Sequence, residues 1–315
     1  MISIHIVVMG AGATGGYLGG LLARGGEDVT FVARGAQLDA MRQRGLTIKS
    51  PAQDDVQLKV KATGDVGSIR HDVDLIMFCV KTYDVDTAVE TIKPIVGPRT
   101  VVLPIQNGVD TADRLCRVLG ERHLLGGLAY MSVAVDEPGI IDLKSASVRL
   151  IFGELEGGLT TRVEAVQDCL ARSGIHAEVH PNVRQALWEK FVFICGVNGV
   201  TTVTRLPLGT ILATQETAAF LKSVMSEAAS VALKKGIALS ADSVERAFST
   251  AGRMGPDVRG SMYYDLVSGK RLELEALNGA VVRLGRAFNV PTPYNFAVYA
   301  CLKPFMNGQP VPRRQ

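Results

Sequence analysis

The sequence predicts an α/β domain built on a parallel sheet, followed by an all-helical domain. In the first half of the chain, short apolar runs rich in Val and Ile alternate with helix-like segments. Beyond about residue 182 the strand-like alternation gives way to long helical patterns. A length of 315 residues is enough for two domains of ordinary size. We therefore place the α/β domain at residues 1–182 and the helical domain at residues 183–315.

The first half contains the elements of a doubly covered sheet. Four apolar runs are predicted to be buried strands: Ile4–Met9, Val29–Ala33, Val73–Val80 and Thr100–Ile105. The segments between them are predicted to be helical: Ala13–Arg24, Ala36–Arg44 and Val85–Ile95. Repetition of strand, helix and strand indicates parallel strands with helices on both faces. Further strands are predicted at Ala129–Val135, Ile140–Leu143 and Val148–Phe152.

The second half is predicted to be helical. Asn182 is a suitable N-cap for a helix that begins at Val183. Apolar residues then recur at helical spacing, and the longest such patterns run over Thr217–Lys235 and Leu272–Phe288.

Composition excludes several classes of partner and site. The net charge is only +3, with 34 basic and 31 acidic residues spread along the chain, so we expect no nucleic-acid surface. Five widely spaced cysteines are typical of reduced thiols in the cytoplasm, where we expect the protein to be found. We expect no metal site, because no histidine lies in a ligand motif. Met1–Ala23 carries no charge, but its six glycines argue against a membrane span, and we expect no membrane contact.

A glycine motif follows the first predicted strand and opens the first predicted helix. It reads Gly10-Ala11-Gly12-Ala13-Thr14-Gly15. In this context the first glycine permits a tight turn, the second lets the backbone approach a pyrophosphate, and the third allows close helix packing. The motif therefore predicts a Rossmann-type dinucleotide site, the alternative being a glycine-rich turn without a ligand.

The end of the second predicted strand indicates which dinucleotide is bound. An NAD-binding protein usually places Asp or Glu there, against the ribose hydroxyl. This strand instead ends in Arg34, whose planar guanidinium suits a 2′-phosphate, so we expect NADP(H). The alternative is that Arg34 lies on the surface and Asp28 serves the ribose.

Lys190 is the strongest candidate for catalysis. It is the only charged residue between Glu189 and Arg205, in a long apolar stretch. Reduction of a carbonyl needs a cation or proton donor beside the developing oxyanion, and a lysine in apolar surroundings gives up its proton more readily. Asn198 follows eight residues later, so one helix would place both on neighbouring faces. A lysine that extends from a helix end to solvent is the alternative.

Motifs along nearly the whole chain resemble the ketopantoate reductase (2-dehydropantoate 2-reductase) family. They are Ala33-Arg34-Gly35, Val80-Lys81-Thr82, Gln106-Asn107-Gly108, Trp188-Glu189-Lys190 with Asn198, Ser261-Met262-Tyr263-Tyr264-Asp265 and Glu273-Leu274-Glu275-Ala276-Leu277-Asn278-Gly279. The resemblance implies a Rossmann domain joined to a helical domain, with the active site in the cleft between them.

The resemblance also implies roles for the residues of the helical domain. Lys190 matches the catalytic lysine and Glu273 its acidic partner. Ser261 matches a contact of the substrate carboxylate, and Asn198 a substrate-binding asparagine. Taken alone, Glu273 could equally be a helix-surface charge, and Ser261 a cap for a helix that begins at Met262.

Three residues of the first domain match family positions near the cofactor. Asn107 and Lys81 match residues near the nicotinamide and the cleft, and Asn107 is expected to bind substrate as well. Arg34 matches the contact of the 2′-phosphate. Taken alone, Asn107 could be only a turn residue.

Two departures from the family pattern bear on the substrate. Ile194 stands four residues after Lys190, and Val258 three residues before Ser261, where the family commonly has asparagine. The leading hypothesis is NADPH-dependent reduction of ketopantoate to pantoate, in pantothenate biosynthesis. Reduction of a different 2-oxo acid is the first alternative, and a non-catalytic NADPH-binding redox sensor the second. The sequence leaves the oligomeric state open, with a homodimer as one option.

Overall fold

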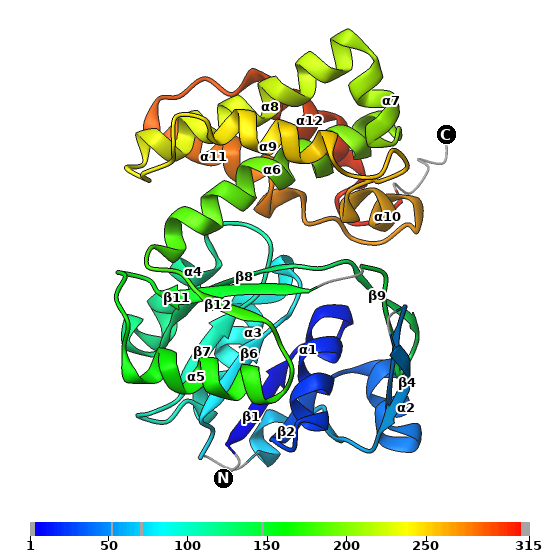
Figure 1. Ribbon diagram of the computed structural model, residues 1–315, viewed down its shortest axis with the longest axis vertical. Coiled ribbons are helices and arrows are strands. Elements are labelled where there is room, and N and C mark those ends of the chain that lie inside the picture. Colours follow the sequence, from blue (N-terminus) through cyan, green and yellow to red (C-terminus); the bar gives the residue numbers. More distant parts are fainter. Residues whose placement is uncertain (1–3, 52, 70–71, 146–147, 310–315) are drawn as a thin grey trace, which may run out of the picture. The chain divides into compact units, whose positions relative to one another are not determined.

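A computed structural model describes residues 4–51, 53–69, 72–145 and 148–309 (Figure 1). The chain forms two compact units, one of residues 1–106 and 110–183, the other of residues 107–109 and 184–315. The first is an α/β unit and the second is helical, so the fold class predicted from the sequence is confirmed.

A parallel sheet forms the centre of the first unit. Its strands, in the spatial order β5-β2-β1-β6-β7, are Lys61–Thr63, Asp28–Val32, His5–Met9, Leu75–Phe78 and Val101–Pro104. All four pairings are parallel. The residues of β6 and β7 are all buried, which explains why these segments read as uninterrupted apolar runs.

Helices follow several strands of the first unit. The α-helices are α1 (Ala13–Arg24), α2 (Gly35–Arg44), α3 (Val85–Ile92), α4 (Thr111–Leu119) and α5 (Thr161–Arg172). Short 3-10 turns are η1 (Val66–Ser68), η2 (Thr82–Asp84), η3 (Lys93–Ile95) and η4 (Glu121–His123). A Cβ on Gly19 of α1 would lie 2.6 Å from the ring of Phe31, so glycine lets α1 pack closely on the sheet. This packing accounts for part of the glycine content of the uncharged N-terminal segment.

Two smaller sheets complete the first unit. One has the order β4-β3-β10-β9, with strands Gln53–Leu58, Leu46–Ser50, Ile140–Leu143 and Val133–Glu137. The other has the order β12-β11-β8, with strands Ala177–Val179, Arg149–Glu154 and Leu125–Tyr130. The strand predicted over Ala129–Val135 is in fact two strands, β8 and β9, that belong to different sheets. Residues 131–132 between them are not part of either strand, and the local hydropathy of the sequence does not indicate this interruption.

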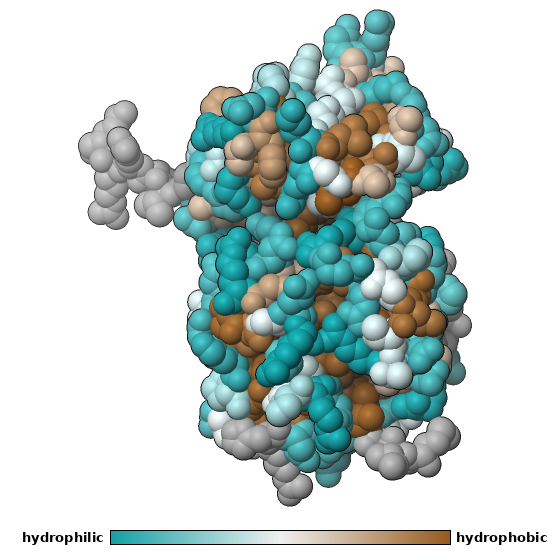
Figure 2. All heavy atoms as spheres, turned by 90° about the vertical axis from the view of Figure 1, so that its left-hand side faces the viewer, coloured by the Kyte–Doolittle hydropathy of each residue, from teal (hydrophilic) through white to brown (hydrophobic). Residues whose placement is uncertain are grey.

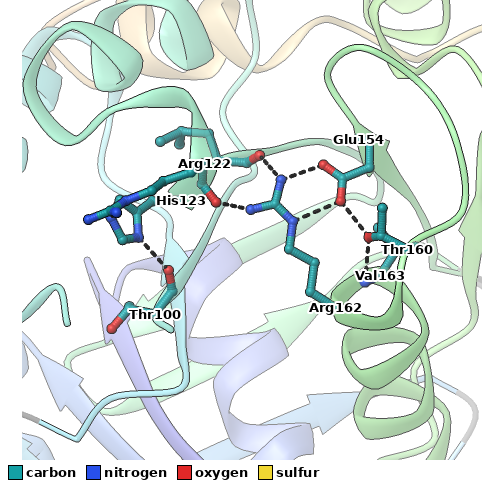
Figure 3. A network of polar contacts seen from close by, with 8 residues as sticks. Thr100, Arg122, His123, Glu154, Thr160, Arg162 and Val163 are labelled. Carbon is teal, nitrogen blue, oxygen red and sulfur yellow. Dashed lines mark hydrogen bonds and ion pairs between the residues drawn. The ribbon is translucent and has the colours of Figure 1, made fainter. Parts of the chain in front are cut away.

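A partly buried ion pair connects α5 to the sheet that contains β11. Figure 3 shows the guanidinium of Arg162 facing both carboxylate oxygens of Glu154, with Nε at 2.7 Å from Oε1 and Nη2 at 2.5 Å from Oε2. The hydroxyl of Thr160 donates to the same carboxylate, and Arg162 also donates to the backbone carbonyl of Leu124. Burial raises the pKa of Glu154, but these hydrogen bonds and the charge of Arg162 outweigh it and hold that pKa below its ordinary value.

The second unit is built of helices around its own apolar core. They are α6 (Val183–Thr204), α7 (Leu208–Ala213), α8 (Gln215–Lys234), α9 (Ser243–Gly252), α10 (Ser261–Val267), α11 (Asn278–Phe288) and α12 (Pro293–Leu302), with the 3-10 turns η5 (Leu274–Ala276) and η6 (Lys303–Phe305). The helix predicted over Leu272–Phe288 begins only at Asn278, because η5 and a bend at Leu277 precede it. The core includes Trp188, Phe191, Met225 and Val281.

Hydrophilic and hydrophobic residues are interleaved on the face of the molecule drawn in Figure 2. The large apolar side chains that remain exposed come from different parts of the described chain, among them Leu159, Leu233 and Val267. None of the helices in the described part of the chain combines the length and the hydropathy needed to cross a bilayer.

Candidate functional site

The predicted glycine motif forms a tight turn between β1 and α1. Gly10 has a φ of +97°, a conformation that favours glycine, and its N–H together with that of Ala11 donates to the carbonyl of Val32 at 3.2 and 3.1 Å. A Cβ on Gly10 would lie 2.8 Å from the backbone nitrogen of Val80. The turn is therefore held between the end of β2 and the segment that follows β6.

The other two glycines leave room for a ligand and for the helix. A Cβ on Gly12 would meet nothing within 4 Å, so the backbone there faces open space. A Cβ on Gly15 would lie 2.2 Å from the carbonyl oxygen of Gly10, so only glycine fits. Gly12 is the N-cap of α1 and has no side chain of its own to cap the helix. Open space at the N-terminus of a three-turn helix fits the pyrophosphate of a dinucleotide.

Arg34 lies at the same end of the sheet as this turn. It is the N-cap of α2, its side chain is 86% exposed, and Nη2 lies 2.5 Å from Oδ2 of Asp84. Asp28 lies at the opposite end of β2, in register with His5, and its carboxylate accepts from Lys61 at 2.6 Å. The carboxylate weighed as an alternative ribose contact is thus far from the glycine turn along the strand. Lys81 is exposed and is the N-cap of η2.

Two glutamines that are not among the candidate site residues support the turn and the segment after β6. Gln37 of α2 donates from Nε2 to the carbonyl of Ala11 at 2.9 Å and accepts from Gly139 N at 2.9 Å. Gln106 donates to the carbonyls of Phe78 and Val80, at 2.8 and 3.1 Å. Gln106 stood in one of the family-like motifs, whereas no local signal marks Gln37, because its partners come from distant segments.

Lys190 is buried on α6, with 8% of its surface exposed. Its Nζ donates to Oδ1 of Asn107 at 2.9 Å. Burial lowers the pKa of Lys190 to about 8, against an opposing effect of the Glu273 carboxylate. The lysine is therefore buried rather than extended to solvent, and its ammonium gives up a proton more readily than that of an ordinary lysine.

Three separate segments form the surroundings of this lysine. Glu273 is 9% exposed and directly precedes η5, so it is not a helix-surface charge. Asn107 comes from the loop after β7, but residues 107–109 of this loop belong to the second compact unit. Gly108, with a φ of +105°, brings this loop against η5, since a Cβ there would lie 3.1 Å from the carbonyl oxygen of Ala276. A cation, an amide and a carboxylate are thus gathered in one buried place.

Asn198, on α6 like Lys190, forms a second polar pair with Ser261 of α10. Oδ1 of Asn198, which is 5% exposed, accepts from the Ser261 hydroxyl at 3.2 Å and from Met262 N at 3.0 Å. The N-cap of α10 is Gly260, so Ser261 is the first helical residue rather than the cap. A Cβ on Gly260 would lie 2.5 Å from Oδ1 of Asn198, so the glycine allows this approach.

Lys190 and Asn198 both lie on α6, so this one helix fixes the distance between them. Eight residues separate Lys190 from Asn198, a rise of about 12 Å at ~1.5 Å per residue. Ile194, 7% exposed, lies one turn from each on the same side of the helix. Val258 is half-buried against the core of this unit.

A second polar region of the described chain lies apart from the predicted site residues. A surface depression of about 300 Å³ is lined by residues around Glu154 and Arg162, and none of the site residues predicted from the sequence lines it. Two of its charged side chains, Glu154 and Arg162, form an ion pair with one another. Within the same described ranges, no group of three or more His, Cys, Asp or Glu side chains is arranged to hold a metal ion.

Comparison with known proteins assigns the chain to a family. The model of the family described as ketopantoate reductase PanE/ApbA matches residues 6–157, and the model of its C-terminal domain matches residues 182–306. The chain belongs to the ketopantoate reductase family. The resemblance inferred from the motifs is therefore confirmed, and the protein is an oxidoreductase that acts on a keto or hydroxyl group.

Individual members of the family match over almost their full length. An uncharacterized oxidoreductase, YkpB, of Bacillus subtilis is 31% identical, with 95% of this chain and 98% of that protein covered. The 2-dehydropantoate 2-reductase of Pyrococcus horikoshii is 30% identical over 95% of this chain and 97% of its own length. The crystal structure of a PanE/ApbA family ketopantoate reductase from Ralstonia eutropha superposes with a TM-score of 0.88, at 32% identity, over 96% of this chain and 98% of that one.

Proposed function

We propose that this protein reduces ketopantoate to pantoate with NADPH, in pantothenate biosynthesis. The observation that carries the proposal is the buried ammonium of Lys190 beside Asn107 and Glu273, with its pKa lowered to about 8. A proton donor with a pKa near the working pH is the group that reduction of a carbonyl needs. Relatives named 2-dehydropantoate 2-reductase support the choice of substrate.

Residues of the first unit fit the cofactor. A bound nicotinamide dinucleotide supplies the hydride. The open space over Gly12 and the N-terminus of α1 suit its pyrophosphate, and the exposed guanidinium of Arg34 suits the 2′-phosphate of NADPH. Lys81, at the start of η2, follows β6, the strand next to β1, and is proposed as a further cofactor contact.

Residues of the second unit act on the substrate. As hydride adds to the keto carbon, the carbonyl π bond breaks and negative charge develops on oxygen. Lys190 donates a proton to that oxygen and becomes a neutral amine, which burial favours. Glu273 keeps Lys190 protonated before the reaction, and Asn107 orients its ammonium. Asn198 and Ser261 are proposed to bind the substrate, with Ser261 on its carboxylate.

A different 2-oxo acid is the second candidate substrate, and Ile194 is the observation that favours it. Its apolar side chain lies on α6 between Lys190 and Asn198, one turn from each, so it offers no hydrogen bond to a substrate hydroxyl. A site that cannot bond a hydroxyl discriminates weakly between a hydroxylated substrate and its deoxy analogue, by about a hundredfold at most.

The test is a comparison of two substrates that differ only in that hydroxyl. Ketopantoate and trimethylpyruvate are each incubated with the protein and NADPH, and oxidation of NADPH is followed by its near-ultraviolet absorbance. A kcat/KM for ketopantoate far above that for trimethylpyruvate supports the proposal. Equal or higher values for trimethylpyruvate support the second candidate. Tight NADPH binding without turnover on either acid contradicts both and points to a non-catalytic redox sensor.

A further inference from the structure

The guanidinium that would bind the 2′-phosphate is already paired with a carboxylate. Nη2 of Arg34 donates to Oδ2 of Asp84 at 2.5 Å, and the side chain of Asp84 is 27% exposed against 86% for that of Arg34. The residues are fifty positions apart in sequence. Nothing in the local sequence around Arg34 indicates this partner.

The topology of the sheet places this ion pair beside the glycine turn. Arg34 follows β2 and Asp84 follows β6, and these strands are the two neighbours of β1. All three are parallel, so their carboxyl ends lie at one edge of the sheet. Gly10 contacts both sides, through its hydrogen bond to Val32 and its close approach to Val80. The ion pair thus joins the two segments that flank the turn.

A 2′-phosphate and the Asp84 carboxylate are drawn to the same guanidinium. An arginine binds a phosphate best through two parallel N–H groups, and the bond from Nη2 to Asp84 takes up one of the N–H groups that Arg34 could offer. A phosphate carries more negative charge than a carboxylate, and an exposed ion pair in water is weak, so a phosphate can displace Asp84. Because the ion pair with Asp84 must be broken first, the affinity for the cofactor that carries the 2′-phosphate is lower than Arg34 would give without Asp84.

We propose that Asp84 is a specificity-determining residue that competes with the 2′-phosphate of NADPH for Arg34. The inference rests on the proposed use of NADPH. A cofactor without the 2′-phosphate leaves the ion pair in place, so its binding is not opposed in this way. Asp84 therefore narrows the preference for NADPH over NADH that Arg34 would otherwise give.

The test measures dissociation constants of NADPH and NADH by titration of the full-length protein. The variants are Asp84→Asn, Arg34→Ala and the double variant. Asp86→Asn is the matched control, because it removes the same charge from α3 two residues away, where the partner is Arg114 at 2.8 Å. We expect Asp84→Asn to tighten NADPH binding about 2- to 5-fold, the size of an exposed ion pair. NADH binding should change less than about twofold, and Asp86→Asn should leave the ratio unchanged.

The double variant separates competition from direct repulsion. If Asp84 acts through Arg34, the gain from Asp84→Asn disappears once Arg34 is alanine. A gain that persists without Arg34, or NADPH binding that is unchanged or weaker in Asp84→Asn, overturns the inference while leaving the proposed function intact. A wild-type protein that binds neither dinucleotide, or prefers NADH, instead overturns the proposed use of NADPH and the inference with it. Circular dichroism melting of each variant confirms that it is folded.

Discussion

The ammonium nitrogen of Lys190 lies 2.9 Å from the amide oxygen of Asn107, although 83 residues separate them in sequence. Asn107 supplies an acceptor to a cation that burial would otherwise leave poorly solvated. The loop that carries Asn107 lies in sequence between two segments of the first unit, but its residues 107–109 belong to the second unit. This hydrogen bond holds the ammonium of Lys190, the proposed proton donor, in a defined orientation.

Replacement of Lys190 by alanine should lower kcat by about 10²- to 10⁴-fold, the usual contribution of a positioned acid. NADPH affinity should fall far less than kcat, because the pyrophosphate and 2′-phosphate contacts proposed at Gly12 and Arg34 lie elsewhere in the chain. Steady-state kinetics and NADPH titration measure the two effects. Lys234→Ala, which removes an exposed lysine from α8, is the control and should leave both unchanged. Near-normal turnover in Lys190→Ala would remove Lys190 from the mechanism.

The pH dependence of kcat/KM should report the titration of Lys190. The protonated amine is the active form, so kcat/KM should be level at neutral pH and fall as the pH rises through about 8. The Glu273 carboxylate raises the pKa of Lys190, so Glu273→Gln should move this fall to lower pH. An unmoved or upward-shifted limb in Glu273→Gln would contradict the electrostatic coupling of these two residues.

Arg34→Ala should weaken NADPH binding about 10- to 100-fold, the range for losing a charge-assisted hydrogen bond. NADH lacks the 2′-phosphate, so its binding should change little. Arg99→Ala, which removes another exposed arginine of the same unit, is the control. Equal losses for both dinucleotides would show that Arg34 does not bind the 2′-phosphate.

Alanine substitutions at two glycines of the turn should have different effects, one on the stability of the fold and the other on NADPH binding. Gly10→Ala forces a φ of +97° on an L-residue and drives its Cβ to 2.8 Å from Val80 N. It should lower the free energy of unfolding by about 1 to 3 kcal/mol. Gly12→Ala meets nothing within 4 Å, so stability should hold while NADPH binding weakens tenfold or more, about 1.4 kcal/mol. Urea unfolding and NADPH titration give the two readouts, and unchanged NADPH binding in Gly12→Ala would argue against a pyrophosphate there.

Arg162→Met should destabilise the fold by about 2 to 4 kcal/mol at neutral pH, because it leaves the carboxylate of Glu154 buried without its cation. Arg149→Met is the matched control, since it breaks the exposed pair with Glu178, and should cost less than about 1 kcal/mol. Urea unfolding measures both.

The same pair has a defined pH dependence. The folded-state pKa of Glu154 is lowered, so its contribution to stability is present above its unfolded pKa of 4.5 and is lost as the pH falls through the folded value. In Arg162→Met the hydrogen bonds and the charge of Arg162 are lost, so burial of Glu154 is opposed only by the hydrogen bond from Thr160 and its pKa rises. The deficit of the variant relative to wild type should therefore shrink in mild acid, and a deficit that grows there would contradict the assignment.

Much of the fold and part of the site could be predicted from local sequence. Strands buried on both faces read as continuous apolar runs, which is why β1, β6 and β7 were identified. The short edge strand β5 and the more polar strands β3 and β4 were not, since their pairing depends on partners elsewhere. The interruption between β8 and β9 could not be predicted for the same reason, since the two strands pair in different sheets.

The sequence by itself determined the features that depend on near neighbours. These are the glycine turn, whose backbone conformation only glycine adopts, and the helix α6, whose period sets Lys190 and Asn198 on neighbouring faces. Only the tertiary structure decided which distant groups meet. It brings Asn107 to Lys190 and Asp84 to Arg34, and it buries the lysine deeply enough to lower its pKa. Electrostatic interactions depend on separation in space and on local dielectric, and neither can be read from positions along a chain.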